Sequence, residues 1–140
     1  MHLRIILITA LAFSAAACSQ QGKKPRLRES AVVGTWRSDT LPVAGAPGRM
    51  YQLSMTAAGM AELVSEDIGK SPIAERGTWD GADSLVRVVV RGANTASRPT
   101  SMLLAIRGDQ LGLVQFDSTE WGSNGLTLYR RRDSTRTLKP

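Results

Sequence analysis

Cysteine and histidine each occur once in this chain of 140 residues, and both lie near its start, at Cys18 and His2. A single cysteine excludes a disulfide within the chain, so packing has to stabilise the fold. From residue 19 onward there is neither imidazole nor thiol, which excludes Ser-His-Asp and Cys-His catalysis and the usual zinc and copper ligand sets. We therefore predict that the protein is not an enzyme and has no metal site or other cofactor.

The chain also lacks a long apolar run. The run at its start covers residues 5–17, and at thirteen residues it is shorter than the roughly 20 that a membrane-spanning helix needs. A basic start, an apolar run and then small residues form the pattern of a secretory signal peptide. We therefore expect residues 1–17 to be removed after export.

The only cysteine directly follows Ala15, Ala16 and Ala17 in the stretch SAAACSQQ. This arrangement resembles the lipobox of bacterial lipoproteins. The resemblance implies that Cys18 carries lipid and that Ser19 directs the protein to the outer membrane, at its periplasmic face; a secreted or inner-membrane-anchored protein is the alternative. Two or three acyl chains anchor a protein stably, because each buried methylene contributes about 0.8 kcal/mol.

The net charge of +6 comes from the two ends of the chain. Residues 19–29 contain four basic residues and one acidic residue, and residues 130–140 contain five and one, whereas residues 30–129 contain eight and ten. Nucleic-acid binding would need a basic surface on the folded part, so no nucleic-acid partner is expected. The basic ends either contact anionic lipid headgroups beside the anchor or are simply solvated.

After the signal peptide the sequence divides into three parts. Residues 18–31 predict a lipidated cysteine and a flexible tether, residues 32–132 one β-domain, and residues 133–140 a basic tail. Short apolar runs separated by turn residues predict no helix and eight strands, at residues 32–38, 49–56, 60–66, 73–80, 84–91, 101–107, 111–117 and 126–131. Because eight strands joined by short connections can close on themselves, we predict an all-β fold, a small antiparallel eight-stranded lipocalin-like barrel after a cleaved lipoprotein signal peptide.

Alternation of apolar and polar residues predicts which side chains point inward. The expected core residues are Tyr51, Leu53, Met55, Val86, Val88, Val90, Met102, Leu104, Ile106, Leu126 and Leu128. A barrel of eight strands is either filled by such side chains or holds one small ligand. The sequence leaves both possibilities open.

The tripeptide GTW occurs twice, at residues 34–36 and 77–79. In a strand, a glycine and the tryptophan two residues later point to the same side, which leaves room for the indole ring. Trp36 and Trp79 are therefore predicted either to close one end of the barrel by packing or to line a ligand pocket. Trp121, in the loop before the last strand, is a further predicted contact residue, because loops at a barrel mouth often carry recognition.

Two acidic pairs are the remaining source of acid–base chemistry. Glu66 with Asp67, and Asp80 with Asp83, lie at predicted strand ends or turns. A catalytic acid needs a pKa raised by burial, whereas solvent at these places keeps carboxylates ionised. A hydrolase or transferase is therefore disfavoured.

Leu41 and Pro42, followed by Gly48, a turn at Gly59 and the second GTW, form a recognisable series. With these features, residues 34–81 resemble the N-terminal domain of NlpE-type lipoproteins, often described as copper-resistance or copper-homeostasis proteins. The resemblance implies a lipocalin-like barrel tethered to the outer membrane, with a role in sensing surface adhesion and envelope stress. It also makes Leu41, Pro42 and Gly48 predicted binding residues.

The same family carries a Cys-x-x-Cys pair in the loop after Leu-Pro. Here Val43 and Ala46 occupy the matching positions. Thiolates that could bind Cu(I) or respond to oxidation are absent, so the resemblance implies neither a copper nor a redox role for this chain.

Two functions follow from the sequence. The first is a non-enzymatic, NlpE-like envelope lipoprotein that binds or reports to a protein partner, with a filled interior and functional loops. The second is a lipocalin-like carrier that holds a small apolar ligand in the barrel near Trp36 and Trp79, in a cavity of at least roughly 300 Å³. In both, the lipid anchor attaches the protein to a membrane.

Overall fold

The computed structural model describes residues 27–94, 96, 98–116 and 118–132. The predicted signal peptide, Cys18, most of the predicted tether and the predicted tail lie outside the described residues. The elements of the described chain are α1 (Glu29–Val32), β1 (Gly34–Ser38), β2 (Leu41–Val43), β3 (Ala46–Met55), β4 (Met60–Asp67), β5 (Ile73–Ala82), β6 (Leu85–Arg91), β7 (Thr100–Arg107), β8 (Gln110–Gln115), α2 (Ser118–Trp121) and β9 (Thr127–Arg130).

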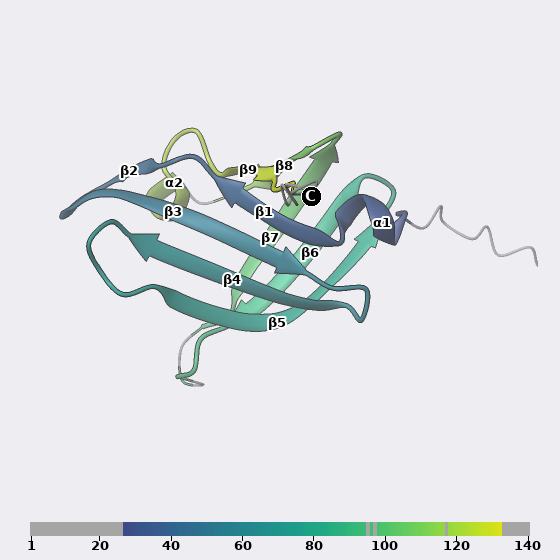
Figure 1. Ribbon diagram of the computed structural model, residues 1–140, viewed down its shortest axis with the longest axis horizontal. Helices are drawn as coiled ribbons and strands as arrows, with labels where there is room; N and C mark the ends of the chain where they lie inside the picture. The colour runs from purple at the N-terminus through teal and green to yellow at the C-terminus, as the bar shows by residue number, and fades with distance from the viewer. Residues whose placement is uncertain (1–26, 95, 97, 117, 133–140) are drawn as a thin grey trace, which may run out of the picture.

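Eight of the strands close into an antiparallel barrel (Figure 1). The neighbours run β1-β9-β8-β7-β6-β5-β4-β3, and β3 pairs back onto β1, so that the sheet has no open edge at this point. Each strand from β3 to β8 pairs with the next strand along the chain. The predicted all-β fold, an eight-stranded antiparallel barrel, is confirmed.

All eight predicted strands are present, but three short elements were not predicted. The strand β2 continues the direction of β1 and, among the described strands, pairs with β3 alone. The prediction that there is no helix is wrong, since α1 and α2 each form a helix of four residues. Helices this short have no apolar periodicity to read. The helix α1 begins inside residues 18–31, and Leu27 and Ala31 pack against the barrel core.

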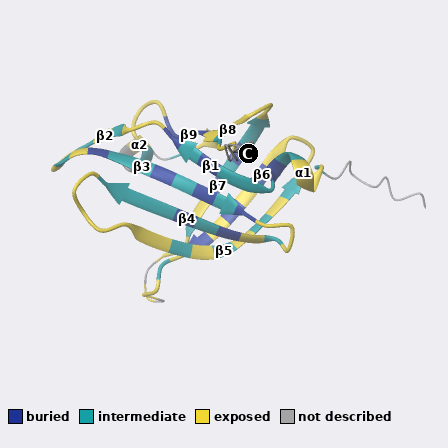
Figure 2. Cartoon of the chain, in the orientation of Figure 1, coloured by how far each residue is buried: buried dark blue, intermediate teal, exposed yellow. Residues whose placement is uncertain are grey.

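The barrel interior is filled with apolar side chains, which form one core cluster. Figure 2 marks the buried residues in dark blue along the strands. In β6, buried and exposed residues alternate strictly, as the valine series predicts. Every expected core residue is buried except Ile106, which is partly buried against the same cluster. Trp36, Leu53 and Leu104 are 0% exposed, so the middle of the barrel is a packed core.

The end of the barrel that carries α1, here called the closed end, is covered by α1 and by the residue that follows it. The indole Nε1 of Trp36 donates a hydrogen bond to the Val32 carbonyl at 2.8 Å. Arg130 lies over the same ring, with its guanidinium carbon 4.2 Å from the ring centroid, and donates to the carbonyls of Ala31 and Val33. One arginine from the last strand thus fixes the segment that leads into the first.

The second GTW lies at the closed end as well. The indole Nε1 of Trp79 donates to the Thr56 carbonyl at 2.8 Å. A Cβ on Gly77 would lie 2.0 Å from the Val89 carbonyl oxygen, so β5 can approach β6 this closely only with glycine at that position. Both tryptophans are therefore held by backbone carbonyls beside the packed core.

Candidate functional site

At the opposite end, here called the open end, β1 and β9 separate. They pair as far as Ser38 and Leu128, after which the chain turns outward to β2. The Ser38 hydroxyl accepts a hydrogen bond from the backbone N–H of Tyr51 at 2.9 Å and donates one to the Asp39 carbonyl at 2.7 Å. The buried Ser38 side chain thus stabilises the backbone at the end of β1. Beyond this point, β2 no longer pairs with β9.

Gly48 lies close to the segment that enters β2. A Cβ at this position would lie 2.3 Å from Cγ2 of Thr40 and 3.4 Å from the Leu41 carbonyl oxygen, so a larger residue would require the Thr40 side chain to move. The Gly48 carbonyl also accepts a hydrogen bond from the backbone N–H of Ile68 at 2.9 Å. Gly48, one of the predicted binding residues, does not line the pocket described below; its neighbour Arg49 pairs with Leu41.

A pocket of about 470 Å³ lies between β2 and the segment around α2. Its lining residues are Leu41, Pro42, Val43, Ala44, Arg49, Tyr51, Ser118, Trp121, Gly122, Ser123, Asn124 and Gly125. Leu41, Pro42 and Trp121, which the sequence predicted separately, come together here. Trp36 and Trp79 do not contribute to this pocket and lie at the closed end.

Two aromatic rings join the two sides of the pocket. Tyr51 from β3 and Trp121 from α2 have ring centroids 5.2 Å apart and planes tilted by 48°. A tilted pair at this distance is a favourable aromatic geometry. Tyr51 is only 9% exposed, so it links the packed core to the pocket.

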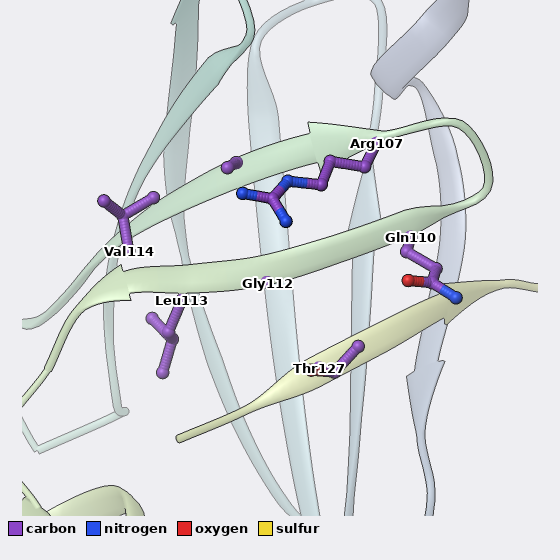
Figure 3. Close-up of a pocket in the computed structure, with 7 residues that line it drawn as sticks. Arg107, Gln110, Gly112, Leu113, Val114 and Thr127 are labelled. Carbon is purple, nitrogen blue, oxygen red and sulfur yellow. The ribbon is translucent and has the colours of Figure 1, made fainter. Parts of the chain in front are cut away.

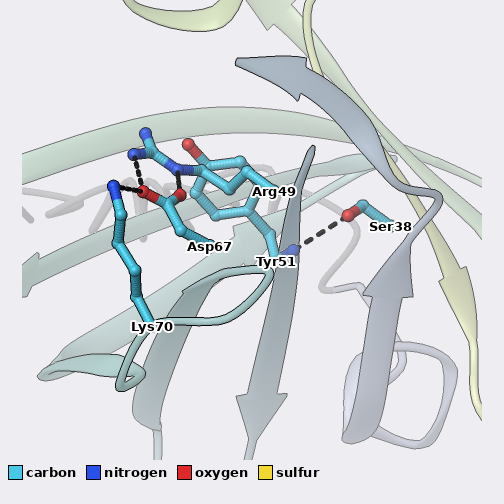
Figure 4. A network of polar contacts seen from close by, with 5 residues as sticks. All are labelled: Ser38, Arg49, Tyr51, Asp67 and Lys70. Carbon is cyan, nitrogen blue, oxygen red and sulfur yellow. Dashed lines mark hydrogen bonds and ion pairs between the residues drawn. The ribbon is translucent and has the colours of Figure 1, made fainter. Parts of the chain in front are cut away.

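Charged residues stand beside Tyr51 (Figure 4). Nε and Nη2 of Arg49 donate to the two carboxylate oxygens of Asp67 at 2.5 and 3.2 Å, and Lys70 donates to the same carboxylate at 3.2 Å. The hydrogen bond from Arg49, helped by the one from Lys70, lowers the pKa of Asp67 to about 2. The pKa of Arg49 is raised, because Asp67 and then Tyr51 stabilise its charged form.

This arrangement does not suit Asp67 to acid–base work. A general acid has to hold a proton near neutral pH, whereas Asp67 is stabilised as a carboxylate. Of the other predicted acidic pair, Asp83 has a positive φ of 57° in the turn between β5 and β6. Within the described residues, no three Asp, Glu, His or Cys side chains form a group that could hold a metal ion.

A second, smaller hollow of about 330 Å³ lies on the outer face of β7, β8 and β9 (Figure 3). It exists because Ala105, Gly112 and Thr127 are paired across three neighbouring strands and have small side chains. Arg107, Gln110 and Val114 border it. No sequence pattern predicted this surface, since small residues on an outward face form no recognisable motif.

Comparison with protein-family models and with curated proteins found no match for this chain. The fold is similar to a crystal structure of the lipoprotein YedD from Klebsiella pneumoniae subsp. pneumoniae MGH 78578, with a TM-score of 0.50 and 16% sequence identity over 80% of each chain. At this identity the likeness shows a shared fold. No helix of the described residues is long and apolar enough to cross a membrane.

Proposed function

We propose that the chain is an exported lipoprotein of the cell envelope, anchored through Cys18, that works by binding and not by catalysis. The signal-like start and the lipobox-like cysteine motivate the anchor, and the structural neighbour is itself described as a lipoprotein. The periplasmic face of the outer membrane is the proposed location, as the resemblance to lipoprotein sorting signals implies.

The pocket at the open end is the proposed binding site, and it is the observation that carries this function. Ligand sites are typically concave, mostly apolar and roughly 300–1,000 Å³ in volume, and this pocket of about 470 Å³ fits that range. Of the two predicted functions, the pocket best supports the carrier of a small, largely apolar ligand. The proposed site is at the mouth and not in the interior, because packed side chains occupy the interior.

A protein partner, as in the NlpE-like function, is the second candidate. It is favoured by the same filled interior, which leaves the loops of the open end as the accessible recognition surface. A photo-crosslinking amino acid at Ser123, in the pocket rim, should then capture one defined envelope protein. The same group at exposed Thr78, on β5, is the control and should not.

Two measurements test the main proposal. Mass spectrometry of the mature protein should find an acylated Cys18 at the N-terminus, and Cys18→Ser should release the protein from the membrane fraction. Compounds with a ten-carbon chain should change the emission of Trp121 in residues 19–140, the chain without the predicted signal peptide and Cys18, since this residue lines the pocket. An unmodified chain that keeps residues 1–17 would refute the anchor, and unchanged emission with every compound would refute the pocket as a ligand site.

A further inference from the structure

We infer that the pocket at the open end binds an amphiphile with an apolar body and an anionic end, and that Arg49 contacts the anion. The inference rests on the proposed function, because it takes the pocket as the binding site and adds the chemical class of the ligand. It makes Arg49 a specificity-determining residue.

The first argument is the position of Arg49 in its strand. Along β3, Met55, Leu53 and Tyr51 are the buried alternate residues, and Arg49 is the next residue of the same series. Side chains two residues apart point to the same face of a strand, so the inward column changes from apolar to cationic at the mouth. Among the described residues that line the pocket, Arg49 is the only charged one.

The second argument is that Arg49 keeps unused donors although it is paired. A guanidinium has five N–H donors, of which the contacts with Asp67 use one on Nε and one on Nη2, and Tyr51 is the other group that stabilises its charge. Lys70 binds the same carboxylate, so the three charges sum to one excess positive charge. The Arg49 side chain is 34% exposed, and Asp67 holds it in one orientation, which reduces the entropy lost when an anion binds.

The third argument concerns the apolar body. Leu41, Val43 and Ala44 form one wall, and Tyr51 with Trp121 forms another. Pro42, in the middle of β2, has no N–H to donate, and a proline in an edge strand prevents the addition of another strand. The pocket therefore fits a compact molecule better than an extended partner chain that pairs with β2.

The test uses three probes with the same ten-carbon chain: decanoate, decan-1-ol and decyltrimethylammonium, each below its micelle concentration at pH 7.5. Binding to residues 19–140, the chain without the predicted signal peptide and Cys18, is measured by titration calorimetry and by the change in Trp121 emission. Decanoate should bind most tightly and the cation most weakly. Arg49→Met should weaken decanoate binding about tenfold or more, because it removes a charged hydrogen bond, and should change the affinity for decan-1-ol far less.

Asp67→Asn separates recognition from a structural role of the ion pair. This variant removes the competing negative charge but keeps the cation and a side-chain oxygen that can still accept from Arg49 and orient it, so decanoate should bind at least as tightly as in the parent. If the ion pair only maintained the pocket, Arg49→Met and Asp67→Asn would weaken decanoate and decan-1-ol alike. Trp121→Phe should abolish the emission change and thereby assign it to the pocket.

The outcomes distinguish the inference from the proposed function. Equal affinity for decanoate and decan-1-ol, or unchanged decanoate binding in Arg49→Met, overturns the anion contact and leaves the pocket as an apolar site. Failure of all three probes, with capture of an envelope protein by the crosslinker at Ser123, overturns both in favour of a protein interface.

Discussion

Arg49 and Asp67 face each other directly across β3 and β4, with Nε of Arg49 2.5 Å from a carboxylate oxygen of Asp67. On β3, Arg49 is the alternate residue that follows Tyr51 in the inward-facing series toward the open end. On β4, Asp67 follows Ser65 in the same way. The barrel interior therefore ends in a paired cation and anion at the open end. Because each charge has a partner, the pair leaves no unpaired charge at the edge of the core.

Asp67 should make the stability of the barrel depend on pH in the acid range. The pKa of its carboxyl is about 2 in the folded protein, below its ordinary value of 3.8, so the unfolded chain binds the proton more readily. The contribution of ionised Asp67 to the free energy of unfolding is complete above about pH 4 and is lost as the pH falls through 2. Urea denaturation from pH 5 to pH 2 should show the parent approaching Asp67→Asn in stability. A constant difference between them across this range would contradict the assignment.

Gly77→Ala should destabilise the barrel strongly. The added Cβ would lie 2.0 Å from the Val89 carbonyl oxygen, and only a shift of the backbone of β5 or β6 could relieve the contact. A loss of about 3 kcal/mol or more in the free energy of unfolding is expected.

Gly112→Ala is the matched control, because a Cβ there has no neighbour within 4 Å. It should change stability by less than about 1 kcal/mol, and alanine in place of a strand glycine should favour the folded state. Equal losses for the two variants in chemical denaturation would show that the close approach at Gly77 is not the cause.

Trp36→Phe should cost about 2 kcal/mol of stability. Trp36 is 0% exposed, and its indole N–H donates a hydrogen bond to the Val32 carbonyl. Phenylalanine has no such donor, so the buried carbonyl would lose this hydrogen bond. Trp79→Phe removes an equivalent bond to Thr56 at a more exposed place and should cost about 1 kcal/mol or less. Thermal and urea unfolding monitored by circular dichroism would test the order of the two.

Arg130→Met should loosen α1 while the barrel stays folded. It removes the hydrogen bonds to Ala31 and Val33 and the positive charge over Trp36. The backbone amides of Ala31 and Val33 donate within α1, so their hydrogen exchange should accelerate about tenfold or more, with little change in β6.

Arg132→Met provides the comparison for that experiment. Arg132 is 83% exposed, and its one described partner is Asp109, at 2.7 Å. Exposed ion pairs contribute little to stability, so exchange in α1 should remain at the parent rate. Faster exchange in both variants would mean that general loss of positive charge, and not the contacts of Arg130, controls α1.

Sequence patterns predicted the long elements and missed the short ones. Valines 86, 88 and 90 alternate with arginines and an exposed valine over a whole strand, so their inward direction was predictable. The strand β2 has three residues and α1 has four, too few for a period to be visible. Arg49 was missed as a site residue because it is charged and therefore breaks the apolar pattern that marks inward-facing positions. Its inward direction follows only from its place in β3, in the same alternating series as Tyr51.

The sequence by itself determined the number of barrel strands, their inward faces and the absence of imidazole and thiol after residue 18, because alternation and composition are local properties. Only the tertiary structure decided that residues 41–44 line one pocket together with residues 118 and 121–125, while the two GTW tryptophans pack at the other end. These contacts depend on closure of the barrel between β1 and β9, and pairing between strands so distant in sequence leaves no signal in any single stretch of the chain.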